Sequence, residues 1–212
     1  MEVILITLAL TAVAVALLLW FFSKDHYIYG FFKMFASTGF IVLCVASGGI
    51  HSVYGCIILG GLVLSWWGDL FLVSRGKTIF MLGLIAFFLA HVCYCTAFVF
   101  YGVGITDTIL VSVIMLIPGV IIMRWLHPHL GTMKIPVYGY IIVISVMTAL
   151  SVSAAYTTGG FLIPCGAVFF YCSDIFVARD RFVAPGRINA YIGLPLYYGG
   201  QVLLALTPLY VS

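Results

Sequence analysis

The sequence predicts an all-α membrane protein in which eight helices form a single bundle. Of its 212 residues, 65% are hydrophobic and 7% are charged, and the mean hydropathy is +1.27. A soluble domain has about 25% charged residues. The apolar residues form long runs without the alternation that a β-barrel requires. Because a backbone in lipid must satisfy its own hydrogen bonds, these runs are expected to be helices.

Apolar runs long enough to cross a membrane occur eight times along the chain. The first follows Glu2 and lacks the basic start and the cleavage site of a signal peptide, so we expect a permanent span. The second and fifth runs are short. No linker or low-complexity segment separates the runs, so residues 1–212 are expected to form one domain. The predicted spans are 3–22, 32–47, 52–73, 78–101, 107–123, 135–156, 160–178 and 188–210.

The basic residues predict the orientation of the bundle. All nine Lys and Arg residues flank or lie in the loops after spans 1, 3, 5 and 7, and the other loops and both termini carry none. Loops rich in Lys and Arg face the cytosol. The N and C termini are therefore expected to be non-cytoplasmic. The net charge of +3 gives no indication of nucleic acid as a partner. The basic residues are Lys24, Lys33, Arg75, Lys77, Arg124, Lys134, Arg179, Arg181 and Arg187.

Two acidic residues, Asp69 and Asp174, lie inside apolar runs near the predicted cytoplasmic ends of spans 3 and 7. An acid at such a position costs about 2.5–3.5 kcal/mol on insertion scales, so two at matching depth indicate a site that needs carboxyl groups. Each acid could instead anchor the interface through a loop arginine. The similar segments Gly68–Phe71 and Ser173–Phe176 predict two four-helix halves in one orientation, although chance convergence explains so short a match equally well.

Further polar residues lie in spans 4 and 8. His91 and Gln201 are near mid-membrane, and His91 shares a helix face with Tyr94. Tyr197 and Tyr198 share a face with Gln201. Together with the acids, they predict a polar pocket that opens on the cytoplasmic side. The alternative is that they only hold helices together through hydrogen bonds and packing.

Several other chemistries lack their motifs in this sequence. There is no GxSxG, P-loop, HExxH or CxxC pattern. The six cysteines all lie in apolar runs, where free thiols act as small hydrophobic side chains.

Four ordered segments, Ser65–Asp69, Phe87–Tyr94, Ser173–Phe182 and Tyr197–Gln201, resemble the YhhN-like family of membrane proteins, which includes the lysoplasmalogenases. The resemblance covers about residues 60–205. It implies a membrane hydrolase that cleaves lysoplasmalogens, which are lysophospholipids with a vinyl-ether-linked chain. The products would be a fatty aldehyde and glycerophosphoethanolamine or glycerophosphocholine. The partners would be this lysophospholipid and bilayer lipid, in a bacterial inner membrane or the eukaryotic endoplasmic reticulum.

This chemistry fits the two acids independently. Vinyl ethers hydrolyse when the β-carbon is protonated, which gives an oxocarbenium ion that water captures. Two carboxyl groups in an apolar site can supply the acid and the stabilising carboxylate, as in glycosidases. We expect Asp174 to donate the proton and Asp69 to be its partner, or the reverse, without a metal or other cofactor. The expected substrate-orienting residues are His91, Tyr94, Tyr197, Tyr198 and Gln201. Arg179 and Arg181 would bind phosphate or only set topology.

Three other functions remain open at this stage. A proton-coupled carrier could use the same intramembrane acids. A zinc-dependent membrane amidase would need clustered histidines, and the sequence has no HxxxH pattern. A receptor or scaffold would need no chemistry at either acid.

Overall fold

A computed structural model of the chain describes residues 1–22, 24–74 and 76–210, apart from the side chain of Thr158. Within these residues, eight helices are long and apolar enough to cross a membrane and no strand is present, which confirms the predicted all-α bundle. The helices are α1 (Glu2–Phe21), α2 (His26–Ala46), α3 (Val53–Val73), α4 (Lys77–Tyr101), α5 (Ile105–Leu126), α6 (Lys134–Thr158), α7 (Leu162–Ala178) and α8 (Arg187–Leu206).

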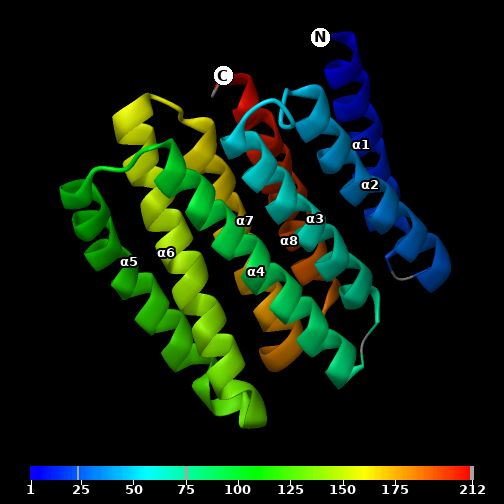
Figure 1. Cartoon of the computed structure of the whole chain (residues 1–212). Coiled ribbons are helices and arrows are strands. Elements are labelled where there is room, and N and C mark those ends of the chain that lie inside the picture. Colours follow the sequence, from blue (N-terminus) through cyan, green and yellow to red (C-terminus); the bar gives the residue numbers. More distant parts are fainter. Residues whose placement is uncertain (23, 75, 211–212) are drawn as a thin grey trace.

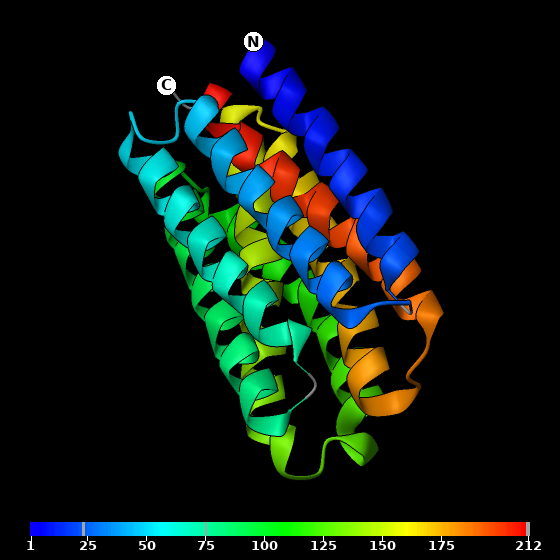
Figure 2. The same cartoon turned by 90° about the vertical axis from the view of Figure 1, so that its right-hand side faces the viewer.

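Six of the helices form a closed ring in the order α2, α3, α4, α6, α7 and α8, and each packs on the next. Helix α1 lies outside the ring against α2 and α8, and α5 lies outside it against α6 (Figure 1). Both termini are at one end of the bundle, and the loops after α1, α3, α5 and α7 are at the other (Figure 2). The described basic loop residues therefore share one end, whereas Arg75 is outside the described residues. That this end faces the cytosol stays a prediction.

Helix α2 begins six residues earlier than the span predicted from residue 32. The Asp25 carboxylate caps it by accepting hydrogen bonds from the backbone N–H groups of Tyr27 and Ile28, at 2.8 and 3.0 Å. The sequence analysis treated Lys33 as flanking the first loop, and this was wrong. Lys33 lies two turns inside α2 and is buried. Asp25 is a typical helix N-cap residue, but the predicted span followed only the uninterrupted apolar run that begins later.

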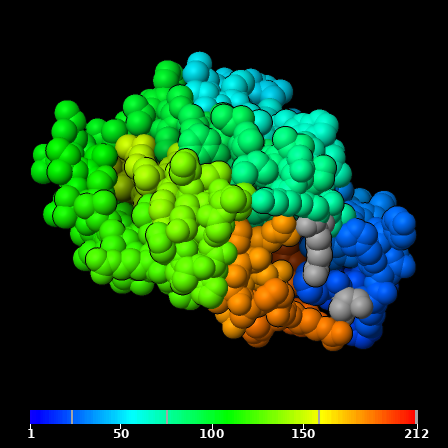
Figure 3. Space-filling model, turned by 90° about the horizontal axis from the view of Figure 1, so that it is seen from below, coloured from blue at the N-terminus to red at the C-terminus, as the bar shows by residue number. Residues whose placement is uncertain are grey.

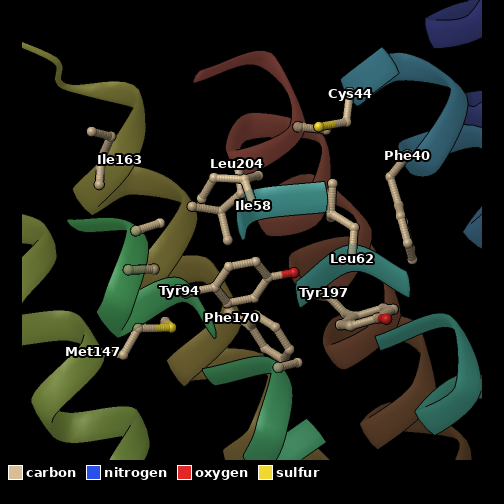
Figure 4. Packing of buried hydrophobic residues seen from close by; sticks show 14 of the residues in the cluster. Phe40, Cys44, Ile58, Leu62, Tyr94, Met147, Ile163, Phe170, Tyr197 and Leu204 are labelled. Carbon is tan, nitrogen blue, oxygen red and sulfur yellow. The ribbon is translucent and has the colours of Figure 1, made fainter. Parts of the chain in front are cut away.

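The middle of the ring is filled by aromatic and aliphatic side chains (Figure 4). Tyr94 and Phe170 are both fully buried there. The Tyr94 ring lies near Met147, and its hydroxyl group points toward the side of the core where Leu62 and Tyr197 lie. The core thus places tyrosine hydroxyl groups, those of Tyr94 and Tyr197 among them, inside a largely apolar cluster.

The hairpins α3–α4 and α7–α8 pack in matching ways around the two acidic positions. A Cβ added at Gly83 would lie 3.5 Å from the carbonyl oxygen of Gly68, the residue before Asp69. A Cβ added at Gly193 would lie 3.6 Å from the carbonyl oxygen of Ser173, the residue before Asp174. The closest approaches are tighter, because the same Cβ atoms would lie 2.9 Å from Leu72 Cδ2 and 3.0 Å from Phe176 Cβ, so glycine lets α4 and α8 pack closely on α3 and α7 at matching places. Asp69 and Asp174 occupy corresponding positions in the two hairpins.

Candidate active site

Asp69, in the last two turns of α3, is held by three side chains. The Lys33 ammonium group lies 3.3 Å from its Oδ1 atom, and the two side chains are 5% and 3% exposed. The hydroxyl groups of Ser37 and Tyr197 both donate to its Oδ2 atom at 2.6 Å. A buried charge is tolerated only when it is paired and hydrogen-bonded. Asp69 therefore lies in a complete environment for a carboxylate.

The Asp69 cluster continues into a buried hydrogen-bond chain on α4 and α8. Gln201 Nε2 donates to the Tyr197 hydroxyl oxygen at 3.2 Å, and the Tyr94 hydroxyl donates to Gln201 Oε1 at 2.9 Å. The Tyr198 hydroxyl lies 3.1 Å from Ser37 Oγ. The structure thus brings four of the predicted residues, Tyr94, Tyr197, Tyr198 and Gln201, into contact with one another or with the partners of Asp69.

Asp174, near the end of α7, has different surroundings. The Tyr140 hydroxyl donates to its Oδ2 atom at 2.7 Å, and its side chain is 19% exposed. The predicted residue His91 is fully buried, with Nε2 4.0 Å from the same oxygen. His91 Nδ1 lies 2.6 Å from the carbonyl oxygen of Phe87, which only accepts hydrogen bonds, so Nδ1 carries the proton. Within the described part of the chain, no group is hydrogen-bonded to His91 Nε2.

Both acids line a single cavity of about 370 Å³. It reaches the end of the bundle that carries the basic loops, where the surface is hollowed between the α7–α8 segment and the first two helices (Figure 3). Its polar lining residues include Lys33, Tyr140 and Tyr197. Helices α4, α5 and α6 contribute a set of apolar lining residues, which we call the apolar wall. Its members are Phe80, Leu84, Ile122, Leu126, Val137, Ile141 and Ile144.

The two predicted arginines lie in a π-helical turn, Arg179–Val183, directly after α7. Arg181 lines the cavity, with its guanidinium carbon 4.4 Å from the centre of the Phe80 ring. Arg179 instead donates to Asn189 Oδ1 at 2.6 Å, which ties the turn to the start of α8. A π-helical turn often marks a functional position because it redirects side chains. Arg181 is thereby presented to the cavity and Arg179 holds the turn.

Lys33, Ser37 and Tyr140 contact the acids and were not predicted from the sequence. Lys33 was predicted only to flank the first loop, and its charge was interpreted as a topology signal. A single serine or tyrosine in an apolar helix gives no indication of its partner. Only the arrangement of the helices in the ring places Ser37 beside Asp69 and Tyr140 beside Asp174. Among the described residues, no three His, Cys, Asp or Glu side chains are grouped so that they could hold a metal ion.

The fold and the site define a membrane-embedded helical protein with two carboxyl groups in one cavity. The chain belongs to the YhhN family, whose model matches residues 28–207. It is 30% identical to lysoplasmalogenase TMEM86A from Bos taurus over 71% of this chain and 64% of that protein. It is 29% identical to lysoplasmalogenase TMEM86B from Homo sapiens over 81% of this chain and 70% of that protein. The chain thus matches somewhat less than two thirds of the bovine relative. No solved structure shows significant similarity to it.

Proposed function

We propose that this protein is a lysoplasmalogenase, which hydrolyses the vinyl-ether bond of an alkenyl lysophospholipid to a fatty aldehyde and a glycerophospho-head group. The observation that carries the proposal is the cavity that Asp69 and Asp174 line together with the apolar wall. The names of the curated relatives support the same activity. Such a cavity has the size and the mixed lining of a small-molecule site.

The reaction needs one acid and one carboxylate. One aspartic acid gives its proton to the β-carbon of the vinyl ether, and the C=C electrons form the new C–H bond. The resulting oxocarbenium ion is stabilised by the other carboxylate, and water adds to its carbon and loses a proton to a carboxylate. The hemiacetal then breaks its bond to the glycerol oxygen, which takes up the hydroxyl proton, and the aldehyde is released. This division of labour between two carboxyl groups is the one that glycosidases use.

The remaining residues bind and orient the substrate and the acids. Arg181, near the mouth, binds the lipid phosphate, since a guanidinium fork suits phosphate oxygens. The apolar wall of α4, α5 and α6 contacts the alkenyl chain. Tyr94 and Gln201 are fully buried behind Tyr197, so they act by orienting it toward Asp69. The site opens toward the cytosol, in the inner membrane of a bacterium or the endoplasmic reticulum of a eukaryote.

The test is aldehyde release by detergent-purified protein from an alkenyl lysophospholipid, with the saturated alkyl ether as a matched control. In deuterated water, with the aldehyde reduced at once to the alcohol, the product is expected to carry one deuterium on the carbon next to the former carbonyl. No aldehyde from folded protein with either ethanolamine or choline head groups would contradict the proposal. Proton uptake into sealed vesicles with substrate but without product would instead indicate a carrier.

A further inference from the structure

The two carboxyl groups of the cavity differ in what holds them. Asp69 has a cation, Lys33, at 3.3 Å and two hydroxyl donors at 2.6 Å. These groups come from α2, which is next to α3 in the ring, and from α8, which follows α2 on its other side. The ammonium group stabilises a negative charge by its own charge, and the two hydroxyl groups stabilise it by the hydrogen bonds that they donate. The cluster is therefore built for an ionised carboxylate.

Asp174 has one hydroxyl donor, Tyr140 at 2.7 Å, and a histidine that brings no N–H to it. Because the Nδ1–H of His91 is committed to Phe87, the Nε2 atom that faces Asp174 carries a lone pair. This atom lies 4.0 Å from Asp174 Oδ2 and is buried, so it adds no cation and no hydrogen-bond donor to the surroundings of Asp174. Of the two acids, Asp174 is also the more exposed, at 19% against 3%.

We propose that Asp174 is the acid that exchanges protons during the reaction, that Asp69 stays ionised throughout, and that Lys33 is the positioning residue that keeps it so. The inference rests on the proposed function and assigns the roles that the sequence left open. It adds Lys33, which contacts Asp69 and acts through it.

The reaction then runs with one proton-exchanging group. The Asp174 carboxylic acid protonates the β-carbon and becomes a carboxylate, while the Asp69 carboxylate faces the oxocarbenium ion. Water adds to the cationic carbon and gives one of its protons to Asp174, while the other stays on the hemiacetal hydroxyl group. That step restores the Asp174 acid, and the hemiacetal collapses by moving its hydroxyl proton to the departing glycerol oxygen. The charge of Asp69 and Lys33 is the same before and after turnover.

The role of Lys33 is tested with Lys33→Met, Lys33→Arg and the double variant Lys33→Met/Asp69→Asn, each assayed on monodisperse protein. Lys33→Met is expected to lower kcat by about 100-fold, the usual effect of losing one buried electrostatic partner, with KM little changed. Lys33→Arg should retain most of the rate. The double variant should be no slower than Asp69→Asn alone, since the two residues act as one unit. Lys77→Met, at an exposed lysine, is the matched control.

Formate separates the roles of the two acids. In Asp69→Ala the Lys33 cation remains to attract the anion, so formate should restore part of the lost rate. In Asp174→Ala no cation of this kind remains, and formate should have no effect. Rescue of Asp174→Ala but not of Asp69→Ala would overturn the assignment of the two acids, and full activity of Lys33→Met would overturn the role of Lys33. If Asp69→Ala does not fold, the role of Lys33 is tested by the double variant Lys33→Met/Asp69→Asn alone, which removes both charges. A rate of the double variant well below that of Asp69→Asn would overturn the role of Lys33.

Failure of the proposed function gives a different result. In that case the wild-type protein releases no aldehyde, and formate changes nothing in any variant. Active wild type with equal rates for Lys33→Met and Lys77→Met would keep the function and remove only the role of Lys33.

Discussion

Gly61 on α3 lies against the ring of Tyr94 on α4, and the substitution Gly61→Ala tests whether this contact holds the core and the site together. A Cβ at Gly61 would lie 2.8 Å from Tyr94 Cδ1, and Tyr94 is fully buried, so it cannot move into solvent. Overpacking of this kind costs about 1–3 kcal/mol. The neighbouring variant Gly60→Ala is the control, since, among the described residues and apart from its own turn of helix, nothing lies within 4 Å of its added Cβ.

Both variants gain about 0.5–1 kcal/mol because alanine favours a helix over glycine. Their difference in unfolding free energy therefore isolates the contact with Tyr94. Each kcal/mol corresponds to about 2–4 °C in Tm for a chain of this size, so Gly61→Ala should melt several degrees below Gly60→Ala in detergent. It should also lower kcat, because Tyr94 orients Gln201, which in turn bonds to Tyr197. Equal Tm and equal kcat for the two variants would refute this reasoning.

Three further predictions concern the substrate. Arg181→Ala should raise KM about tenfold or more by removing a charged hydrogen bond to phosphate, measured against Arg124→Ala as an exposed control, and an unchanged KM would remove the phosphate role. Ile141→Phe places a larger side chain in the apolar wall and narrows the cavity, so it should shift the kcat/KM preference toward shorter alkenyl chains. Ile142 is 55% exposed, and Ile142→Phe should leave that preference unchanged. A saturated alkyl lysophospholipid has no double bond to protonate, so it should inhibit competitively without being cleaved, and its hydrolysis would contradict acid catalysis at carbon.

Much of the fold could be predicted because lipid imposes simple requirements on a sequence. A helix that crosses the membrane needs about 20 apolar residues, and each of the eight predicted spans overlaps one helix of the structure. The ends of the helices were harder to place. Asp25 starts α2 with hydrogen bonds that a search for apolar residues does not detect, and Lys33 was misplaced for that reason.

The site was predicted in part for the same physical reason. Asp69 and Asp174 were conspicuous because charge is costly in lipid, and the structure places both in one cavity. Lys33, Ser37 and Tyr140 could not be paired with them from sequence. Their contacts depend on which helices are neighbours in the ring, and α2 meets α3 and α8 while α6 meets α7. Periodicity within one helix carries no information about that order.

The most direct test of the central claim is aldehyde release from an alkenyl lysophospholipid by wild type, Asp69→Asn and Asp174→Asn, purified in detergent and checked for folding. We expect release by wild type and its collapse in both variants, because each carboxyl group performs a step that the other cannot take over. Undiminished release by either folded variant would contradict it.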